Sequence, residues 1–180
     1  MRIALLSDIH ANRQALDACL AHARSQGAEQ FALLGDLVGY GADPRYVVQQ
    51  AMALVEQGAT VLRGNHDALA IAPPVITDKA SQTGATHGAQ WTHEQLATDE
   101  LAFLAQRPLT AVVHDVLLVH ASADAPERWR YVDNEMVARQ CLEAAQQQHG
   151  VQHVFCGHVH HQTLYYRGTG RDLMRFAPTP

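Results

Sequence analysis

The sequence lacks several features that would place the protein in a membrane, outside the cell or on nucleic acid. No stretch approaches the roughly 20 consecutive apolar residues that a membrane span needs, and Met1-Arg2 leads directly into a short apolar run rather than into a signal peptide. The formal net charge is -5 at pH 7, and the Lys and Arg residues form no basic stripe, which disfavours nucleic acid held through its phosphates. We therefore expect no membrane segment and no extended nucleic-acid-binding surface.

Close cysteine pairs are also missing. Cys19, Cys141 and Cys156 each lie within an apolar pattern, as small buried residues do. Unpaired thiols suit a reducing compartment, so we expect a cytoplasmic protein. There is no internal repeat, low-complexity tract or linker, and a length of 180 residues with 47% hydrophobic content suits one domain over residues 1–180.

Histidine, in contrast, is abundant, with 12 residues in the chain. Several of them follow short apolar runs that have the length of buried strands. Open α/β sheets place their chemistry at the carboxyl ends of strands, so we expect the polar residues after these runs to meet at one edge. The runs end at Asp8 and His10, at Gly35-Asp36 after Phe31 to Leu34, at Asn65 and His66, at His120, and at His158 and His160.

The apolar periodicity predicts an α/β fold. Residues 12–26 and 43–58 are predicted to be helices between the first three apolar runs, with Asp43-Pro44 as N-cap and first turn. This order gives two β-α-β units and at least three parallel strands. Pro73-Pro74 lies in a weakly patterned segment, so residues 68–86 are expected to form a loop over the strand ends. The other predicted elements are helices within 87–106, in two pieces, and within 133–150, a hairpin over 111–119, and strands at 153–156, 163–166 and 173–176.

The polar residues at the strand ends form a mixed set of oxygen and nitrogen donors. In an extended chain, side chains two residues apart point to the same side, so both members of an Asp-x-His or His-x-His pair can reach one metal site. The set suits Mn, Fe or Zn better than Mg or Ca, and it is too large for one such ion. We therefore predict two divalent transition metal ions. The ligands are Asp8, His10 and His160 for one ion, Asn65, His120 and His158 for the other, and Asp36 for both.

Further side chains lie next to this set in the sequence. His66 is not needed as a ligand, so we expect it to act as an acid or to hydrogen-bond a leaving oxygen, the alternative being a supporting contact. Arg13 is a candidate for substrate binding through a phosphate, and His161 for the mouth of the site. A solvated helix start and an exposed turn are the alternatives for these two residues. Asp67 either orients His66 or caps the next turn.

Taken together, these blocks resemble the signature blocks of the calcineurin-like metallophosphoesterases, in the family's order. The resemblance implies a four-layer α/β/β/α sandwich of mixed sheets flanked by helices, and a dinuclear centre with manganese as first choice and iron, nickel or zinc as alternatives. It implies that Asp36 and a hydroxide bridge the metals, that the hydroxide attacks a phosphodiester or phosphomonoester, and that His66 assists the leaving group. The substrate is then a small phosphorylated compound, such as a nucleotide-like one. The matching blocks are Asp8-x-His10, Gly35-Asp36-x-x-Gly39, Gly64-Asn65-His66-Asp67, His120 and Gly157-His158-x-His160.

The sequence departs from other branches of the family at two places. After Asp36 it reads Leu-Val-Gly-Tyr-Gly instead of the Asp-Arg-Gly sequence of the protein serine/threonine phosphatases, so it resembles the small bacterial phosphodiesterase or phosphatase branch. The same missing arginine weakens a diadenosine tetraphosphatase interpretation. Relatives usually carry further strands after the His-x-His block, so we expect this chain to lack some C-terminal strands and to expose a sheet edge.

Two other functions stay open at this point. The fold can serve as a scaffold for protein contacts, as in the retromer subunit that resembles this family, although a scaffold has no need of His66 or of the full ligand set. A single structural zinc would instead predict one ion per chain. Specificity is expected to come from residues 68–86 and 122–131. In the second segment, the side chains that either grip a base or an anion or pack against the loop are Arg128, Trp129, Arg130 and Tyr131.

Overall fold

The first half of the chain forms a parallel sheet with helices between its strands. The computed structural model describes residues 2–75, 77, 83–168 and 173–178. The first sheet holds β1 (Ile3–Leu6), β2 (Gln30–Leu33) and β3 (Thr60–Val61), in that order and all parallel. The crossovers are α1 (Arg13–Ser25) and α2 (Pro44–Glu56), which confirms the two predicted β-α-β units.

The helix starts show which local signals decided the fold. The side-chain oxygen of Asn12 accepts the backbone N–H of Ala15 at 2.9 Å, which satisfies one of the free donors in the first turn of α1. Leu16 then faces the core with 1% exposure. Asp43 occupies the N-cap position of α2, as predicted, although its side chain makes no capping hydrogen bond. Pro44 in the first turn starts the helix instead.

The loop expected at residues 68–86 is shorter than predicted. Helix α3 (Asn65–Ile71) begins within the Gly-Asn-His-Asp block, and α4 (Gly84–Gln95) begins before the expected end of the loop. α3 forms because the carboxylate of Asp67 accepts the backbone N–H of Gly64 at 2.9 Å. The middle of the expected loop, 76 and 78–82, lies outside the described residues. α4 and α5 (Thr98–Ala105) are the two helical pieces predicted for residues 87–106.

The second half of the chain adds two further sheets. β4 (Thr110–Val113) and β5 (Val116–Val119) form the predicted antiparallel hairpin, and β6 (His153–Phe155) lies parallel to β5. The short 3-10 helix η1 (Pro126–Arg128) and α6 (Glu135–His149) connect β5 to β6. β7 (Leu164–Arg167) and β8 (Leu173–Phe176) form a separate antiparallel pair, and they are the strands that the described residues show after the His-x-His block.

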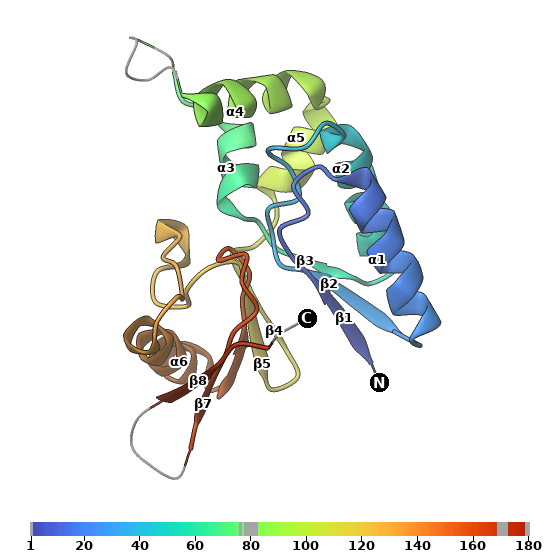
Figure 1. Cartoon of the computed structure of the whole chain (residues 1–180). Helices are drawn as coiled ribbons and strands as arrows, with labels where there is room; N and C mark the ends of the chain where they lie inside the picture. The colour runs from blue at the N-terminus through green and yellow to red at the C-terminus, as the bar shows by residue number, and fades with distance from the viewer. Residues whose placement is uncertain (1, 76, 78–82, 169–172, 179–180) are drawn as a thin grey trace.

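The elements stack in four layers (Figure 1). α1 and α2 cover the outer face of the first sheet, and α6 covers the outer side of the other sheets. Leu34, Leu62 and Leu118 belong to a small core between the two halves. The expected α/β sandwich is therefore confirmed. None of the described helices is both long and apolar enough to cross a membrane.

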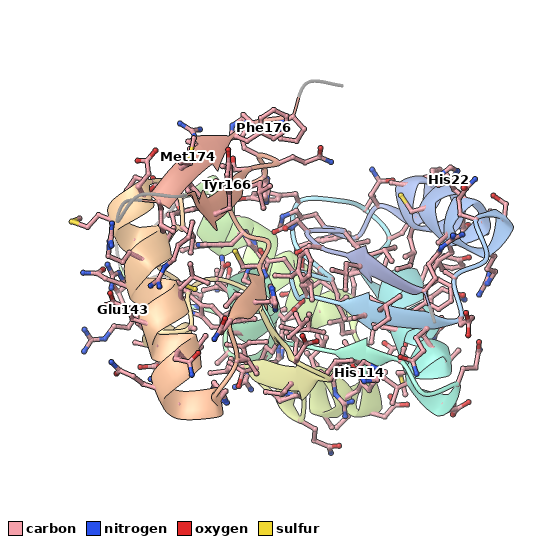
Figure 2. The ribbon with its side chains drawn as sticks, turned by 90° about the horizontal axis from the view of Figure 1, so that it is seen from below. His22, His114, Glu143, Tyr166, Met174 and Phe176 are labelled. Carbon is pink, nitrogen blue, oxygen red and sulfur yellow. The ribbon has the colours of Figure 1, made fainter. Side chains whose placement is uncertain are left out.

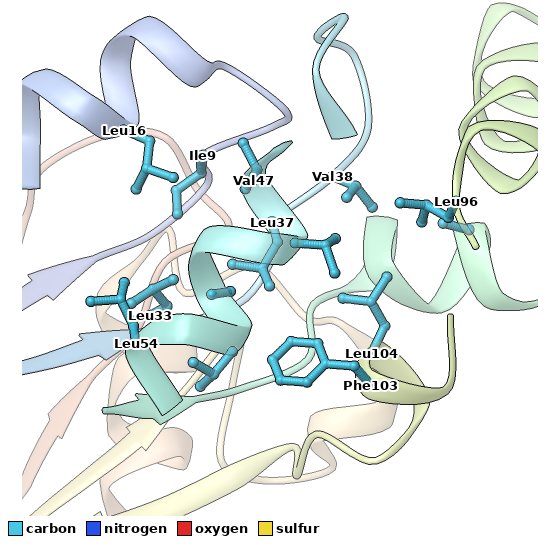
Figure 3. Packing of buried hydrophobic residues seen from close by; sticks show 14 of the residues in the cluster. Ile9, Leu16, Leu33, Leu37, Val38, Val47, Leu54, Leu96, Phe103 and Leu104 are labelled. Atoms are coloured by element: carbon cyan, nitrogen blue, oxygen red, sulfur yellow. The ribbon is translucent and has the colours of Figure 1, made fainter. Parts of the chain in front are cut away.

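The largest core lies between the first sheet and helices α1, α2 and α5 (Figure 3). Leu37 and Val38 are fully buried in it, each with 0% exposure, and they directly follow Asp36 in the chain. Burial of these two side chains anchors the loop after β2. The position of Asp36 therefore depends on the main core.

Loss of this packing is expected to destabilise the protein strongly. Leu104 on α5 has 0% exposure, so Leu104→Ala leaves a cavity and should lower the free energy of unfolding by about 2–5 kcal/mol. Met136→Ala on α6 is the control, because Met136 is 66% exposed and its loss should cost less than about 0.5 kcal/mol. Urea unfolding of both variants measures the difference, and a small effect at Leu104 would contradict the assigned core.

Candidate metal centre

The carboxyl ends of β1, β2, β3, β5 and β6 bring the predicted ligand residues together. Among the described residues, three clusters have donor atoms within 4.8 Å of one another. Their members are Asp8, His10 and His160; His10, Asp36 and His66; and Asp36, His120 and His158. Asn65 lies beside the last cluster, with its Oδ1 3.1 Å from Nε2 of His120. The residues converge as expected, but the strands belong to two sheets rather than to one edge.

The group around His10 is open to solvent. Nε2 of His160 lies 3.2 Å from Oδ1 of Asp8 and 3.1 Å from Nε2 of His10. The same nitrogen of His10 lies 3.8 Å from Oδ2 of Asp36. His160 is exposed, whereas Asp8 and His10 are half-buried. Molecules in solution can therefore reach this end of the site.

The group around His120 is buried. His120, Asp36 and His158 have exposures of 0%, 1% and 7%. Nε2 of His120 lies 3.3 Å from Oδ2 of Asp36, the oxygen that also faces His10. Asp36 thus belongs to both groups.

Backbone carbonyls decide which nitrogen of His10 and His120 faces the centre. Nδ1 of His120 lies 2.9 Å from the carbonyl oxygen of Leu34, and Nδ1 of His10 lies 3.1 Å from that of Val38. Because a carbonyl only accepts, each Nδ1 carries the hydrogen, and Nε2 of the neutral ring carries a lone pair. Contacts of this kind orient the histidines of metal sites.

These orientations place acceptors opposite acceptors. The Nε2 lone pair of neutral His120 faces the oxygens of Asp36 and Asn65, and that of His10 faces Oδ2 of Asp36. Lone pairs at such distances repel each other unless a proton or a cation lies between them. A mixed nitrogen and oxygen set of this kind fits a divalent metal ion.

The charges of Asp36 and His120 stabilise each other. Burial raises the pKa of Asp36, but the hydrogen bond and charge of His120 outweigh burial, so the pKa lies below its ordinary value. Burial similarly lowers the pKa of His120, and the hydrogen bond and charge of Asp36 reverse the direction, so this pKa is raised.

The segment after β5 supports His158 from outside. Nε2 of His158 donates to the carbonyl of Trp129 at 2.8 Å, and the ring of Tyr131 stacks on the imidazole with centroids 4.1 Å apart. Nδ1 of His158 is then the nitrogen left for the centre. Arg130 pairs with Asp124. These contacts of Trp129, Arg130 and Tyr131 are with His158 and Asp124, and binding of a base or an anion by residues 128–131 stays a prediction.

Left-handed backbone conformations recur at the predicted ligands, which corrects the expected extended geometry. A non-glycine residue rarely adopts a positive φ, and such a conformation costs on the order of 1–3 kcal/mol. The Asp-x-His and His-x-His pairs therefore lie in strained turns and not in strands. The φ angles are 55° at Asp8, 49° at His10, 51° at Asp36, 69° at His158 and 59° at His160.

Gly39 allows the loop after β2 to lie against His66. It has a φ of 89°, and a Cβ built on it would lie 2.6 Å from Nδ1 of His66. The backbone N–H of His66 donates to Oδ1 of Asp36 at 2.8 Å, and its ring centroid lies 5.0 Å from that of His10. Burial lowers the pKa of the half-buried His66, although the charge of Asp36 acts in the opposite direction.

Asp67 caps α3 and links it to the loop after β2. Its Oδ2 accepts the N–H of Gly64 at 2.9 Å, and its Oδ1 accepts those of Leu37 at 2.9 Å and Val38 at 3.2 Å. These contacts are with backbone and not with the imidazole of His66, so they support the capping role. Burial and the charge of Asp36 raise the pKa of Asp67 to about 7, against the effect of the backbone donors.

Arg13 and His161 lie at the periphery of the site. The guanidinium of Arg13 lies 4.3 Å from the ring centroid of Tyr46, and its Nε lies 3.8 Å from a carboxylate oxygen of Asp17. His161 is exposed and lines a cavity of about 680 Å³ that also reaches Asp8. Substrate binding by Arg13 and His161 stays a prediction.

Reasoning from the sequence missed the contacts that two residues, Tyr40 and Trp129, make at the site. The ring of Tyr40 lies 4.7 Å from that of His10 and 4.4 Å from that of His66, and Tyr40 is 76% exposed. An aromatic residue between two glycines just after the Gly-Asp block was a usable signal. The carbonyl of Trp129 that holds His158 leaves no signal in the sequence, because any residue supplies one.

The sequence matches the calcineurin-like phosphoesterase family over residues 1–162. The chain belongs to this family. The resemblance found in the motifs is thereby confirmed.

One curated protein and two solved structures are also similar to this chain. The uncharacterized protein MJ0912 of Methanocaldococcus jannaschii is 33% identical over 134 residues, which are 72% of this chain and 53% of the relative. The crystal structure of a metallophosphoesterase from Sphaerobacter thermophilus superposes with a TM-score of 0.76 at 32% identity, over 93% of this chain and 63% of that one. A putative diadenosine tetraphosphatase gives a TM-score of 0.52 at 29% identity, over 74% and 54% of the two chains. The chain thus spans about half the length of the curated relative it matches.

Replacement of Gly39 by alanine is expected to disturb His66 specifically. The new methyl group would lie 2.6 Å from the imidazole, so the ring must move, and the clash adds about 1–3 kcal/mol to the loss of unfolding free energy. Gly58→Ala is the matched control, because Gly58 has a φ of 92° and an added Cβ there meets nothing within 4 Å. That control should lose only about 1–2 kcal/mol, for the strained backbone. Equal losses in urea unfolding would argue against the contact with His66.

Proposed function

We propose that this chain is a hydrolase of phosphodiesters or phosphomonoesters that uses two divalent transition metal ions. Manganese is the first choice, with iron, nickel or zinc as alternatives, because the donors mix imidazole nitrogens with carboxylate and amide oxygens. The main support is the placement of Asp36, a buried carboxylate whose Oδ2 faces both His10 and His120. Family membership supports the same chemistry.

The proposed ligands divide between the two ions. Asn65 contributes an amide oxygen at the buried end, where His120 is its neighbour. His66 lies within reach of His10 and Asp36, but we assign it to catalysis because its ring also borders the exposed Tyr40. The ligand sets are Asp8, His10 and His160 for one ion, Asn65, His120 and His158 for the other, and Asp36 for both.

The bound ions would supply Lewis acidity at the phosphoryl group and lower the pKa of a water molecule. The chain itself positions the reactants. The exposed end at His160 admits the ester, and the buried His120 keeps bulk water from the opposite end. A ring N–H of His66 donates a hydrogen bond to the oxygen that departs from phosphorus, which stabilises the charge developing there.

A small phosphorylated compound is the proposed substrate. Two divalent cations exceed the charge of the Asp8 and Asp36 carboxylates, so the loaded site attracts an anion. The neighbour described as a putative diadenosine tetraphosphatase is consistent with a small phosphorylated substrate.

Hydrolysis of bis-p-nitrophenyl phosphate with added manganese tests the proposed function. The His66→Ala variant should lose about 10²–10⁴-fold in kcat, because it removes the group that assists departure of the leaving oxygen, and it should still bind two ions. His22→Ala is the control, since His22 is an exposed histidine on α1 and belongs to none of the three clusters. Figure 2 labels it at one edge of the molecule. Activity of the unmodified, metal-loaded chain that is no higher than that of His66→Ala would favour the scaffold function.

Removal of the buried ligand His120 is expected to release one ion. Its imidazole is one of the donors of the buried group, whereas the ligands around His10 stay intact in His120→Ala. Metal analysis after gel filtration should give one ion per chain, against two for the unmodified chain and for His114→Ala. His114 lies in the exposed hairpin turn (Figure 2). A single ion in the unmodified chain would instead indicate a structural metal.

A further inference from the structure

A small cavity opens beside His66, and no other described histidine lines it. Its volume is about 190 Å³, and it lies between the loop after β2 and helix α4. The rings of Tyr40, His66 and Trp91 line it, together with the glycines Gly84 and Gly88 of α4. His66 is the group proposed to assist the leaving oxygen, so this cavity borders the imidazole that would contact that oxygen.

The walls of this cavity, the α4 pocket, suit an uncharged flat group. None of the described residues that line it carries a formal charge, apart from a protonated His66. The hydroxyl of Thr92 already donates to the carbonyl of Gly88 at 2.8 Å. Tyr40 and Trp91 are 76% and 42% exposed, so both rings keep surface that can be covered by a ligand. Aromatic faces of this kind pack on planar groups.

The fold does not require glycine at the two helical positions. A Cβ built on Gly84 or on Gly88 meets no atom within 4 Å, and neither residue has a left-handed φ. Glycine inside a helix costs roughly 0.5–1 kcal/mol relative to alanine. The lack of side chains at Gly84 and Gly88 leaves open space beside His66.

We propose, on the basis of the proposed function, that the α4 pocket takes the leaving group of the substrate and that this group is a single uncharged ring, such as an aryl alcohol. A volume of 190 Å³ corresponds to roughly six water molecules at about 30 Å³ each, less than the ~300–1,000 Å³ of a site for a whole ligand. It therefore accommodates one part of a substrate. A charged leaving group, such as the nucleotide released from a dinucleoside polyphosphate, would find no cation among the described lining residues.

Binding of p-nitrophenol to the metal-free protein tests this pocket without any catalysis. The chain has two tryptophans, so Trp129→Phe leaves Trp91 as the fluorescent reporter. At a pH below the pKa of p-nitrophenol, where this phenol is uncharged, we expect it to quench Trp91 saturably, and we expect a Kd raised at least tenfold when Gly88→Leu is added to this background. Gln95→Leu, an exposed position on the same helix, should leave the Kd unchanged. Quenching that does not saturate, or an equal Kd with Gly88→Leu, would overturn the proposal.

Two further measurements keep the outcome decisive. Gly88→Ala improves helix propensity, so α4 is retained even if the leucine variant fails to fold, and its Kd should rise by a smaller factor. In the manganese-loaded chain, Gly88→Leu should raise KM for bis-p-nitrophenyl phosphate while the inhibition constant of inorganic phosphate, which has no leaving group, stays the same. An equal rise in both constants would mean that the whole site is disturbed and would count against the pocket. A chain that binds p-nitrophenol as expected but hydrolyses nothing would contradict the proposed function and leave the proposal for the α4 pocket standing.

Discussion

A carboxylate buried between two groups of histidines is the constraint on which this structure depends. An anion away from water is unfavourable unless hydrogen bonds and opposite charge compensate it. For Asp36 the backbone N–H of His66 and the ring of His120 provide that compensation. Gly64 completes the arrangement, because a Cβ at this position would collide with the side chain and backbone of Asp36. The Gly-Asp and Gly-Asn-His-Asp blocks can therefore reach their conformations only together.

The strain in the turns that carry the ligands is offset by the packing behind them. Each left-handed residue costs energy, and these conformations persist because their neighbours are fixed. Leu37 and Val38 are sealed in the main core, and Asp67 holds their backbone N–H groups. The buried carboxylate of Asp67 thus couples the N-terminus of α3 to the loop that presents Asp36. The hydrophobic core and the backbone hydrogen bonds therefore hold the side chains of the centre in position without a contribution from a cation.

The sequence predicted the parallel sheet, the hairpin and the convergence of the strand ends, because apolar runs that stop at polar residues reflect local burial. It failed where a distant contact decides the conformation. Asp67 caps the helix over residues 65–71 locally at Gly64, but it also binds backbone 30 positions away at Leu37, and nothing in the local pattern encodes that second contact. The left-handed turns at Asp8 and His158 were missed for the same reason, since their φ angles follow from the two sheets packing together. The ligand roles themselves stay predictions that the geometry supports.

A contact between the two sheets joins residues that lie far apart in the chain, and it therefore forms late in folding. The N–H of His158 donates to the carboxylate of Asp8, 150 positions earlier in the chain. Closing a loop of that length has an entropic cost that must be met before the contact is made. The first sheet holds only local crossovers, so during synthesis it can form while the second is still unmade, and the centre is completed last. Cations that bind only the completed centre stabilise the state in which the two sheets are packed together. A shortage of metal would therefore weaken the packing between the sheets as well as leave the site empty.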